Sequence, residues 1–298
     1  MPFFLKIKEI SFLYKIKFKI RIFKQFIYQT YLLIKSNSNI VIVLSFVKHF
    51  FISFDDNKDF IKKIYHEKIF QYDDWFTIKI SILMHYLNRY KFDSGINVLE
   101  IGSFEGRSSI FFANYFNNIN LMCVDTWEKS DEESDKEMQK NIDFRLVEKN
   151  FDNNIKSHSP NIKKYKGTSK AFFKNNNFKN LDFIFIDGSH KYEDVINDAM
   201  SSFKLLKIGG FILFDDLNWF YYKDLKENPS YAINKFLKTF QNQIEIIFAS
   251  TQLLIKKNKI LIKPLKEKGC SAGLISPRSV VRSHFPLPFY TISLKLRH

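Results

Sequence analysis

The chain is predicted to be an α/β protein built on a doubly wound, mostly parallel sheet. Two observations within residues 73–262 predict this class. Short apolar runs, each of strand length, alternate with longer segments whose apolar residues recur every three or four positions. Several of the runs end in an acidic residue or a glycine, as buried parallel strands do where they reach a ligand-binding edge. Such alternation is typical of strand–helix–strand units in a parallel sheet.

The elements follow one another in a regular order. The segment 73–90 is expected to form a helix capped by Asp73 or Asp74, because acids precede an apolar helical pattern. Strands are expected in the runs INVLEIG (96–102), NLMCVDT (120–126), KKYKG (163–167), DFIFIDG (182–188), GFILFDD (210–216), IEIIFAS (244–250) and TQLLIKK (251–257). Helices are expected at 108–115, over most of 130–149, and at 169–175, 192–206 and 229–240, with a turn at Gly209 and Gly210. The result is a Rossmann-like sheet with an antiparallel closing strand.

The charge of the chain belongs to its two ends. The net charge is +15, but residues 1–54 hold nine Lys and Arg against one Glu, and residues 55–262 are close to neutral. A neutral middle argues against binding along a nucleic-acid backbone, so no nucleic-acid partner is expected. We therefore divide the chain into a basic, aromatic-rich N-terminal extension (1–72), a central domain (73–262) and an accessory or disordered tail (263–298), in which residues 268–298 are either native or a frameshift or fusion scar.

The N-terminal extension allows several interpretations. Its segment KIKFKIRIFK (15–24) alternates charged and apolar residues with period two. That pattern fits an edge strand, a basic aromatic segment lying on an anionic membrane or a partner, or a loosely ordered extension. The run 40–54 is interrupted by Lys48 and His49 and is shorter than the roughly 20 apolar residues of a spanning helix. With two cysteines and no secretory signal, the expected location is the cytoplasm, with peripheral membrane attachment as an option.

The stretch VLEIGSFEGRSS (98–109) carries the first candidate site. A buried strand ends in Glu100, and Gly102 and Gly106 bracket a turn into a helix that begins near Ser108. Glycines allow close approach of the backbone to a ligand, and a helix N-terminus presents free N–H groups to an anion. The GxxxG spacing departs from the strict dinucleotide pattern, and a turn without a ligand is the alternative.

A second acid stands about twenty residues further on. Asp125 ends the next strand, and a carboxylate there can accept hydrogen bonds from both hydroxyls of a ribose. The turn and this acid together favour a nucleoside-containing cofactor.

Five motifs in this order resemble one family. VLEIGSFEGRSS, VDTWE, YKGTSKAFF, LDFIFIDGSHKYEDV and LLKIGGFILFDDL are similar to class I S-adenosylmethionine-dependent methyltransferases. The resemblance covers about 73–257 and points to bacterial methyltransferase family 24 and the metal-dependent catechol- and caffeoyl-type O-methyltransferases. It implies that S-adenosylmethionine would be bound by Glu100, Gly102, Ser103, Gly106, Ser108, Asp125, Thr126 and Ser169. Trp127 either covers the cofactor or lies in the core.

The resemblance also implies a cation site. Asp187, Asp215 and Asp216 match the positions of the metal ligands in the metal-dependent branch, although catechol-type relatives have Asn where Asp216 stands. Three converging carboxylates repel one another unless a cation neutralises them, and oxygen ligands favour Mg²⁺, Mn²⁺ or Ca²⁺. The alternative is that these acids only cap a helix or a turn. A divalent cation is therefore an optional second cofactor.

His190 stands where catechol-type enzymes place a basic lysine. An imidazole can take a proton from an acceptor hydroxyl, so His190 and Asp187 are the catalytic candidates. The alternative for His190 is a capping or supporting role. The expected activity is O-methylation of a small hydroxylated acceptor, such as a sugar or a natural product, by a monomer or a homo-oligomer. Two other classes stay open, namely another nucleotide-cofactor enzyme (an oxidoreductase or a nucleotide-sugar enzyme) and a non-catalytic membrane- or partner-binding module.

Overall fold

The structure is a computed structural model that describes residues 12–92, 95–116, 118–130, 139–158, 160–175 and 178–259, with the side chains of the first helix described from residue 18 onward. Every described residue lies within residues 1–261. The predicted tail and Cys270 lie outside the described residues.

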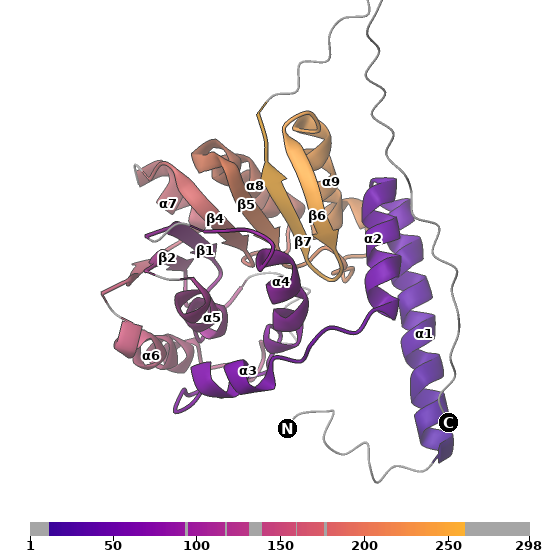
Figure 1. Cartoon of the computed structure of the whole chain (residues 1–298), viewed down its shortest axis with the longest axis horizontal. Helices are drawn as coiled ribbons and strands as arrows, with labels where there is room; N and C mark the ends of the chain where they lie inside the picture. Colours follow the sequence, from indigo (N-terminus) through magenta and orange to yellow (C-terminus); the bar gives the residue numbers. More distant parts are fainter. Residues whose placement is uncertain are drawn as a thin grey trace, which may run out of the picture. The chain divides into compact units, whose positions relative to one another are not determined.

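The described part of the chain is organised around a seven-stranded sheet of order β3-β2-β1-β4-β5-β7-β6 (Figure 1). Its strands are β1 (Asn97–Ile101), β2 (Asn120–Asp125), β3 (Ile162–Lys166), β4 (Leu181–Ile186), β5 (Leu206–Phe214), β6 (Ile244–Ala249) and β7 (Leu253–Lys257). The strands from β3 to β5 pair in parallel, whereas β7 runs antiparallel to both of its neighbours. This confirms the predicted Rossmann-like fold class with its antiparallel closing strand.

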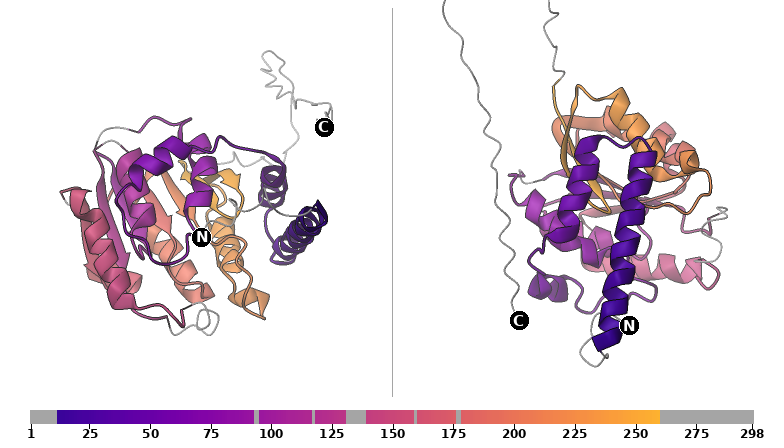
Figure 2. Two further views of the ribbon diagram at one scale, coloured as in Figure 1. Left: turned by 90° about the horizontal axis from the view of Figure 1, so that it is seen from below. Right: turned by 90° about the vertical axis from the view of Figure 1, so that its right-hand side faces the viewer.

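Helices cover both faces of the sheet (Figures 1 and 2). One core cluster joins one face to α4 (Ile80–Leu87), α5 (Arg107–Tyr115) and α6 (Phe144–Ile155), with α3 (Lys58–Ile64) packed beside them. The other cluster joins the opposite face to α7 (Ser169–Asn175), α8 (Tyr192–Leu205) and α9 (Pro229–Thr239). Successive strand residues alternate between the clusters, as Phe183 and Phe185 do against Ile184 and Ile186.

This topology brings four chain crossings to one edge. Because β1, β2, β4 and β5 are parallel, the loops that leave their carboxyl ends emerge together. These loops begin at Gly102, after Asp125, at Asp187 and at Asp215. Most of the candidate site residues predicted from the sequence therefore lie at or next to this edge.

The segment 15–24 of the N-terminal extension is helical, so the edge strand and the loosely ordered chain considered for it are wrong. Helix α1 spans Phe12–Lys35 and α2 spans Ile40–Phe51, with Asn39 Oδ1 accepting from Val41 N at 2.9 Å. The period-two pattern of 15–24 was misleading because apolar residues in the same segment also recur at helical spacing. Further along the same helix, Phe26 and Leu33 are buried in the second core cluster. Among the described residues, no helix has both the length and the apolar character to span a membrane.

Three local expectations need correction or refinement. Within the described part of 130–149, a helix begins only at Phe144, where the Asp143 side chain accepts from Arg145 N at 3.0 Å, and it continues to Ile155. Gly209 and Gly210 form no turn between elements but lie inside β5, where the register against β4 shifts and Gly209 has φ +86°. The helix expected from residue 73 begins instead as a 3₁₀ turn, Thr77–Lys79. Asp74 Oδ1 accepts a hydrogen bond from Thr77 N at 2.9 Å.

Candidate active site

The turn after β1 packs directly on the loop after β4. Gly102 has φ +85°, and a Cβ atom there would lie 1.9 Å from the carbonyl oxygen of Asp187. Only glycine is therefore compatible with this approach, and its function is to join two loops of the edge. Gly106 also has a positive φ, +83°, and begins α5 against the ring of Phe151.

Asp125 holds the backbone of that turn. Its Oδ2 accepts from Ser103 N at 2.8 Å and from Phe104 N at 2.9 Å, and its Oδ1 accepts from Trp127 N at 2.7 Å. The carboxylate is half-buried, and its Oδ1 atom receives one hydrogen bond from the described residues, so this oxygen can accept another. Asp125 thus fixes the turn and retains acceptor capacity for a ligand.

Glu100 lies beneath the turn and is fully buried. Its Oε2 accepts from Ser103 Oγ at 3.0 Å, from Cys123 Sγ at 3.2 Å and from Ser109 Oγ. Burial raises the pKa of Glu100, and these donors, together with Ser108, oppose the rise. The Oε1 atom has no hydrogen-bond partner among the described residues. Glu100 therefore braces the predicted cofactor turn from below.

Asp187, Asp215 and Asp216 converge at the ends of β4 and β5. One carboxylate oxygen from each lies within 4.8 Å of the others, which makes them a candidate cation site among the described residues. Burial raises the pKa of Asp187 well above its usual range, and the charges of the other two acids raise it further. Three acids of one sign at this separation require a positive group nearby.

Lys79, which the sequence reasoning missed, supplies one positive group. It lies in the 3₁₀ turn before α4, and its Nζ donates to Asp215 Oδ2 in a mostly buried ion pair. The other carboxylate oxygen, Oδ1, accepts from Gln252 Nε2, whose side chain is fully buried. Burial by itself lowers the pKa of Lys79, but the three carboxylates outweigh it and raise the pKa above its usual value. The only sequence signal was a lysine between Ile78 and Ile80 in an apolar segment.

His190 lies beside this cluster with its ring fixed from two sides. Its Nε2 lies 3.3 Å from Asp216 Oδ2, and its ring stacks on Trp219 with centroids 4.2 Å apart and planes within 1°. Burial acts to raise the pKa of Asp216, but the hydrogen bond and charge of His190, with Lys79, lower it below its usual value. An imidazole paired with a carboxylate in this way can accept a proton and have the resulting charge stabilised.

The remaining predicted residues lie just after β2 and at the start of α7. Thr126 Oγ1 accepts from Glu128 N at 3.3 Å. Trp127 is a core residue, because it is 2% exposed and its Nε1 donates to Phe104 O at 2.9 Å. Ser169 begins α7, and its side chain acts to lower the pKa of Asp198, a buried acid on α8 that the sequence reasoning did not single out.

A strap formed by residues 69–79 crosses the turn after β1. Glu105, buried in that turn, accepts from Gln71 N at 3.0 Å and from Tyr72 N at 3.1 Å. Asp74 pairs with Arg107 Nη1 at 3.3 Å. These contacts hold the strap against the turn, and Lys79 at its end pairs with Asp215 just after β5. The strap therefore adds a positive charge to the site from outside the sheet.

A sheet of this order, with an acid-lined edge at the ends of its parallel strands, defines the class I methyltransferase fold. The chain is matched over residues 99–217 by the family described as "Methyltransferase domain", which is family 24 of the methyltransferase domains. An uncharacterized protein of Acanthamoeba polyphaga mimivirus is 30% identical over 169 residues, which cover 56% of this chain and 70% of that protein. The chain belongs to this methyltransferase family, which confirms the family predicted from the sequence.

Several solved structures are similar to the chain at low identity. The O-methyltransferase TomG from Streptomyces achromogenes, in complex with SAM, has 14% identity and a TM-score of 0.43, with 74% of this chain and 97% of that chain covered. An O-methyltransferase from Bacillus cereus in complex with SAH has 17% identity and a TM-score of 0.42, with coverages of 73% and 99%. The MycE methyltransferase of mycinamycin biosynthesis, in complex with Mg and SAH, has 15% identity and a TM-score of 0.47, with coverages of 74% and 58%.

The family match decides between the classes that the sequence left open. The predicted methyltransferase is favoured, and the oxidoreductase, the nucleotide-sugar enzyme and the non-catalytic module are not. The roles of individual residues remain predictions that rest on the geometry described above.

Proposed function

We propose that the protein is an S-adenosylmethionine-dependent O-methyltransferase that acts on a hydroxyl group of a small molecule. The observation that carries the proposal is the gathering of Asp125, the three-aspartate cluster and His190 at the carboxyl ends of four parallel strands in a methyltransferase-family chain. Ligands of wound sheets bind at such an edge. The edge therefore has a carboxylate that can accept hydrogen bonds from a nucleoside and groups that can transfer a proton.

In the proposed complex, the turn 102–106 and Ser108 border the methionine half of the cofactor, with Glu100 bracing the turn. Asp125 and Thr126 accept the ribose hydroxyls, and Ser169 borders the adenine. The support is positional, since these groups follow β1, β2 and β3 in the order of the sheet. The free acceptor capacity of Asp125 Oδ1 is the specific feature that suits a ribose.

A divalent cation fits the chemistry of the acidic cluster. Asp187, Asp215 and Asp216 offer oxygen ligands only, which suit Mg²⁺, Mn²⁺ or Ca²⁺. These three residues would hold the ion, which when bound supplies a Lewis acid that orients the acceptor oxygen and lowers its pKa. Lys79 already pairs with Asp215, so a bound ion would either share the Asp215 carboxylate with the Lys79 ammonium group or displace that group.

The reaction needs alignment and a proton acceptor. The acceptor oxygen attacks the sulfonium methyl carbon in line, the O–C bond forms as the C–S bond breaks, and the electron pair stays on sulfur in S-adenosylhomocysteine. The hydroxyl proton passes to the His190 imidazole. Asp216, 3.3 Å from Nε2, stabilises the imidazolium, and Trp219 keeps the ring in its plane. Positioning of the two reactants supplies most of the acceleration.

Thermal unfolding with different cofactors tests the proposal. A ligand at about 100 times its dissociation constant stabilises the folded state by about 2.7 kcal/mol. We expect such a shift with S-adenosylmethionine and S-adenosylhomocysteine and none with NAD⁺ or a uridine diphosphate sugar. Methyl transfer is then followed with radiolabelled cofactor on a panel of phenols and sugars. Stabilisation by NAD⁺ or the nucleotide sugar instead would overturn the proposal.

A variant of Asp125 locates the cofactor site. Asp125→Asn keeps the size of the side chain but replaces one acceptor oxygen by a donor amide. It is expected to weaken S-adenosylhomocysteine binding at least tenfold in calorimetry. An unchanged affinity would remove Asp125 from the cofactor site.

A further inference from the structure

The helical hairpin formed by α1 and α2 is attached to the sheet through its inner side (Figure 2). Ser45 Oγ donates to Ala249 O at 3.0 Å and accepts from Ala249 N at 2.8 Å, which ties α2 to β6. On α1, Phe26 is buried and stacks on Phe50 of α2 with centroids 3.8 Å apart. The inner faces therefore have partners within the described part of the chain.

The outer side of the hairpin is apolar and exposed. On α1 the stripe recurs at steps of three and four residues over four turns, and it consists of Ile20, Phe23, Ile27, Tyr31 and Ile34, each about half exposed. That spacing places all five on one face of the helix. On α2 the exposed apolar residues are Ile40, Val41, Leu44 and Phe51, of which Phe51 is 68% exposed. Exposed apolar residues gathered on this scale mark an interaction surface.

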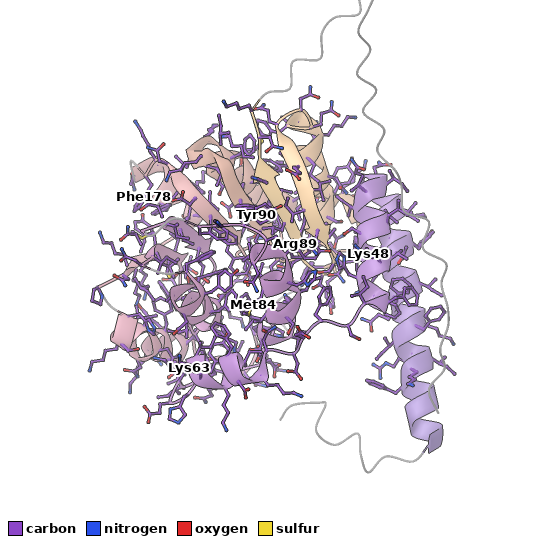
Figure 3. The ribbon with its side chains drawn as sticks, in the orientation of Figure 1. Lys48, Lys63, Met84, Arg89, Tyr90 and Phe178 are labelled. Carbon is purple, nitrogen blue, oxygen red and sulfur yellow. The ribbon has the colours of Figure 1, made fainter. Side chains whose placement is uncertain are left out.

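The charges around the stripe are all of one sign. No Asp or Glu occurs between residues 12 and 54. The basic residues whose side chains are described there are exposed, namely Lys19, Arg21, Lys24, Lys35 and Lys48, the last labelled on α2 in Figure 3. Lys24 and Lys35 stand next to the stripe on the helix surface, and Lys35 Nζ lies 5.1 Å from the centre of the Tyr31 ring. The surface is a basic amphipathic face.

The exposed apolar residues and the basic charges together favour an anionic lipid surface over a second copy of the chain as the partner of this face. In a symmetric dimer through this face, the same patch would meet itself, so lysines and arginines would oppose one another with no acid on either hairpin to pair with them. An anionic lipid surface offers the opposite charge together with an apolar layer for the stripe. No described helix can span the bilayer, so the contact lies in the plane of the interface.

We propose that the outer face of the α1–α2 hairpin docks the protein on an anionic membrane surface. The stripe from Ile20 to Ile34 inserts among the headgroups and upper acyl chains, and the flanking lysines and Arg21 contact lipid phosphates or carboxylates. The proposal is independent of the methyl-transfer chemistry, since the hairpin contributes no residue to the acidic cluster.

Co-sedimentation of the full chain with vesicles tests the proposal. Two compositions are compared, phosphatidylcholine alone and phosphatidylcholine with about one third phosphatidylserine, because the charge contribution requires anionic lipid. We expect binding to the serine-containing vesicles, much weaker binding to the neutral ones, and a loss of binding as salt rises well above physiological strength.

Matched variants assign the contact to the hairpin. The double variant Ile27→Glu with Ile34→Glu is expected to lower vesicle partitioning at least about tenfold. Ile208→Glu makes the same change at an exposed apolar residue of β5, 60% exposed, and is expected to bind as the unaltered chain does. Circular dichroism confirms that each variant is folded.

Three outcomes would overturn the proposal. They are equal partitioning of the double variant and the Ile208 control, equal binding to both lipid compositions, and absence of vesicle binding with a dimer in light scattering that the double variant abolishes. The last outcome would assign the face to a second copy of the chain.

Discussion

Replacement of Lys79 by methionine tests how the acidic cluster is kept stable. The variant removes the ammonium group from an ion pair whose side chains are 13% and 5% exposed, and it leaves three carboxylates within 4.8 Å of one another. Two unit charges about 4 Å apart interact by about 4 kcal/mol at an effective dielectric constant of about 20. Removal of one partner of a buried pair costs about 3–5 kcal/mol. We expect the free energy of unfolding to fall by that amount above neutral pH.

The pH dependence of this loss has a definite sign. Burial raises the pKa of Asp187 and of Asp215, so these acids take up protons more readily in the folded than in the unfolded chain. Acidification therefore removes the repulsion that Lys79 offsets, and the difference between Lys79→Met and the unaltered protein shrinks as pH falls toward the usual range of aspartate. Urea unfolding followed by circular dichroism at several pH values measures it.

A control and an added ion sharpen the test. Lys79→Arg keeps the charge and is expected to lose much less stability than Lys79→Met. Mg²⁺ should restore part of the loss in Lys79→Met, up to about 2.7 kcal/mol at 100 times its dissociation constant. Equal stability of the Met variant and the unaltered protein above neutral pH, in the presence of chelator, would refute the reasoning.

Three further predictions concern other parts of the site. Burial raises the pKa of Asp198 from 3.8 to about 7, so its contribution to stability is complete below about pH 4 and is lost as pH rises through 7. Asp198→Asn should remove this pH dependence and stabilise the protein in basic solution by up to roughly 4 kcal/mol. An unchanged pH profile of the melting temperature in this variant would contradict the prediction. Gly102→Ala should abolish folding or lower the free energy of unfolding by several kcal/mol, because the new Cβ atom would meet the Asp187 carbonyl group. Gly209→Ala has open space around it and should lower that free energy by only about 1–2 kcal/mol. Equal losses of the two variants in urea unfolding would argue against the loop contact. With an acceptor supplied, His190→Ala should lower turnover at least about 10²-fold and leave S-adenosylhomocysteine affinity within about twofold, and a parallel loss of both in kinetics and calorimetry would indicate a structural role.

The sequence by itself determined the sheet and the side chains at the carboxyl edge of its parallel strands. Apolar runs such as 183–186 have the length and composition of a buried strand, and several of the runs end in an acidic residue or a glycine. Parallel strands deliver those ends to the same edge, so the location of Asp125, Asp187 and Asp215 at one edge was predictable without coordinates. The family motifs depend on the same local pattern.

Only the tertiary structure decided what surrounds those acids. The Lys79–Asp215 ion pair joins residues 136 positions apart, and no periodicity in either segment signals it. Trp127 had two equally acceptable local interpretations, and its packing on Phe151 placed it in the core. The segment 15–24 likewise fits a strand or a helix until its partners are known, and the packing of α1 on α2 decides for the helix. The physical reason is common to all three: burial and charge depend on what lies across the fold, whereas periodicity depends on the chain alone.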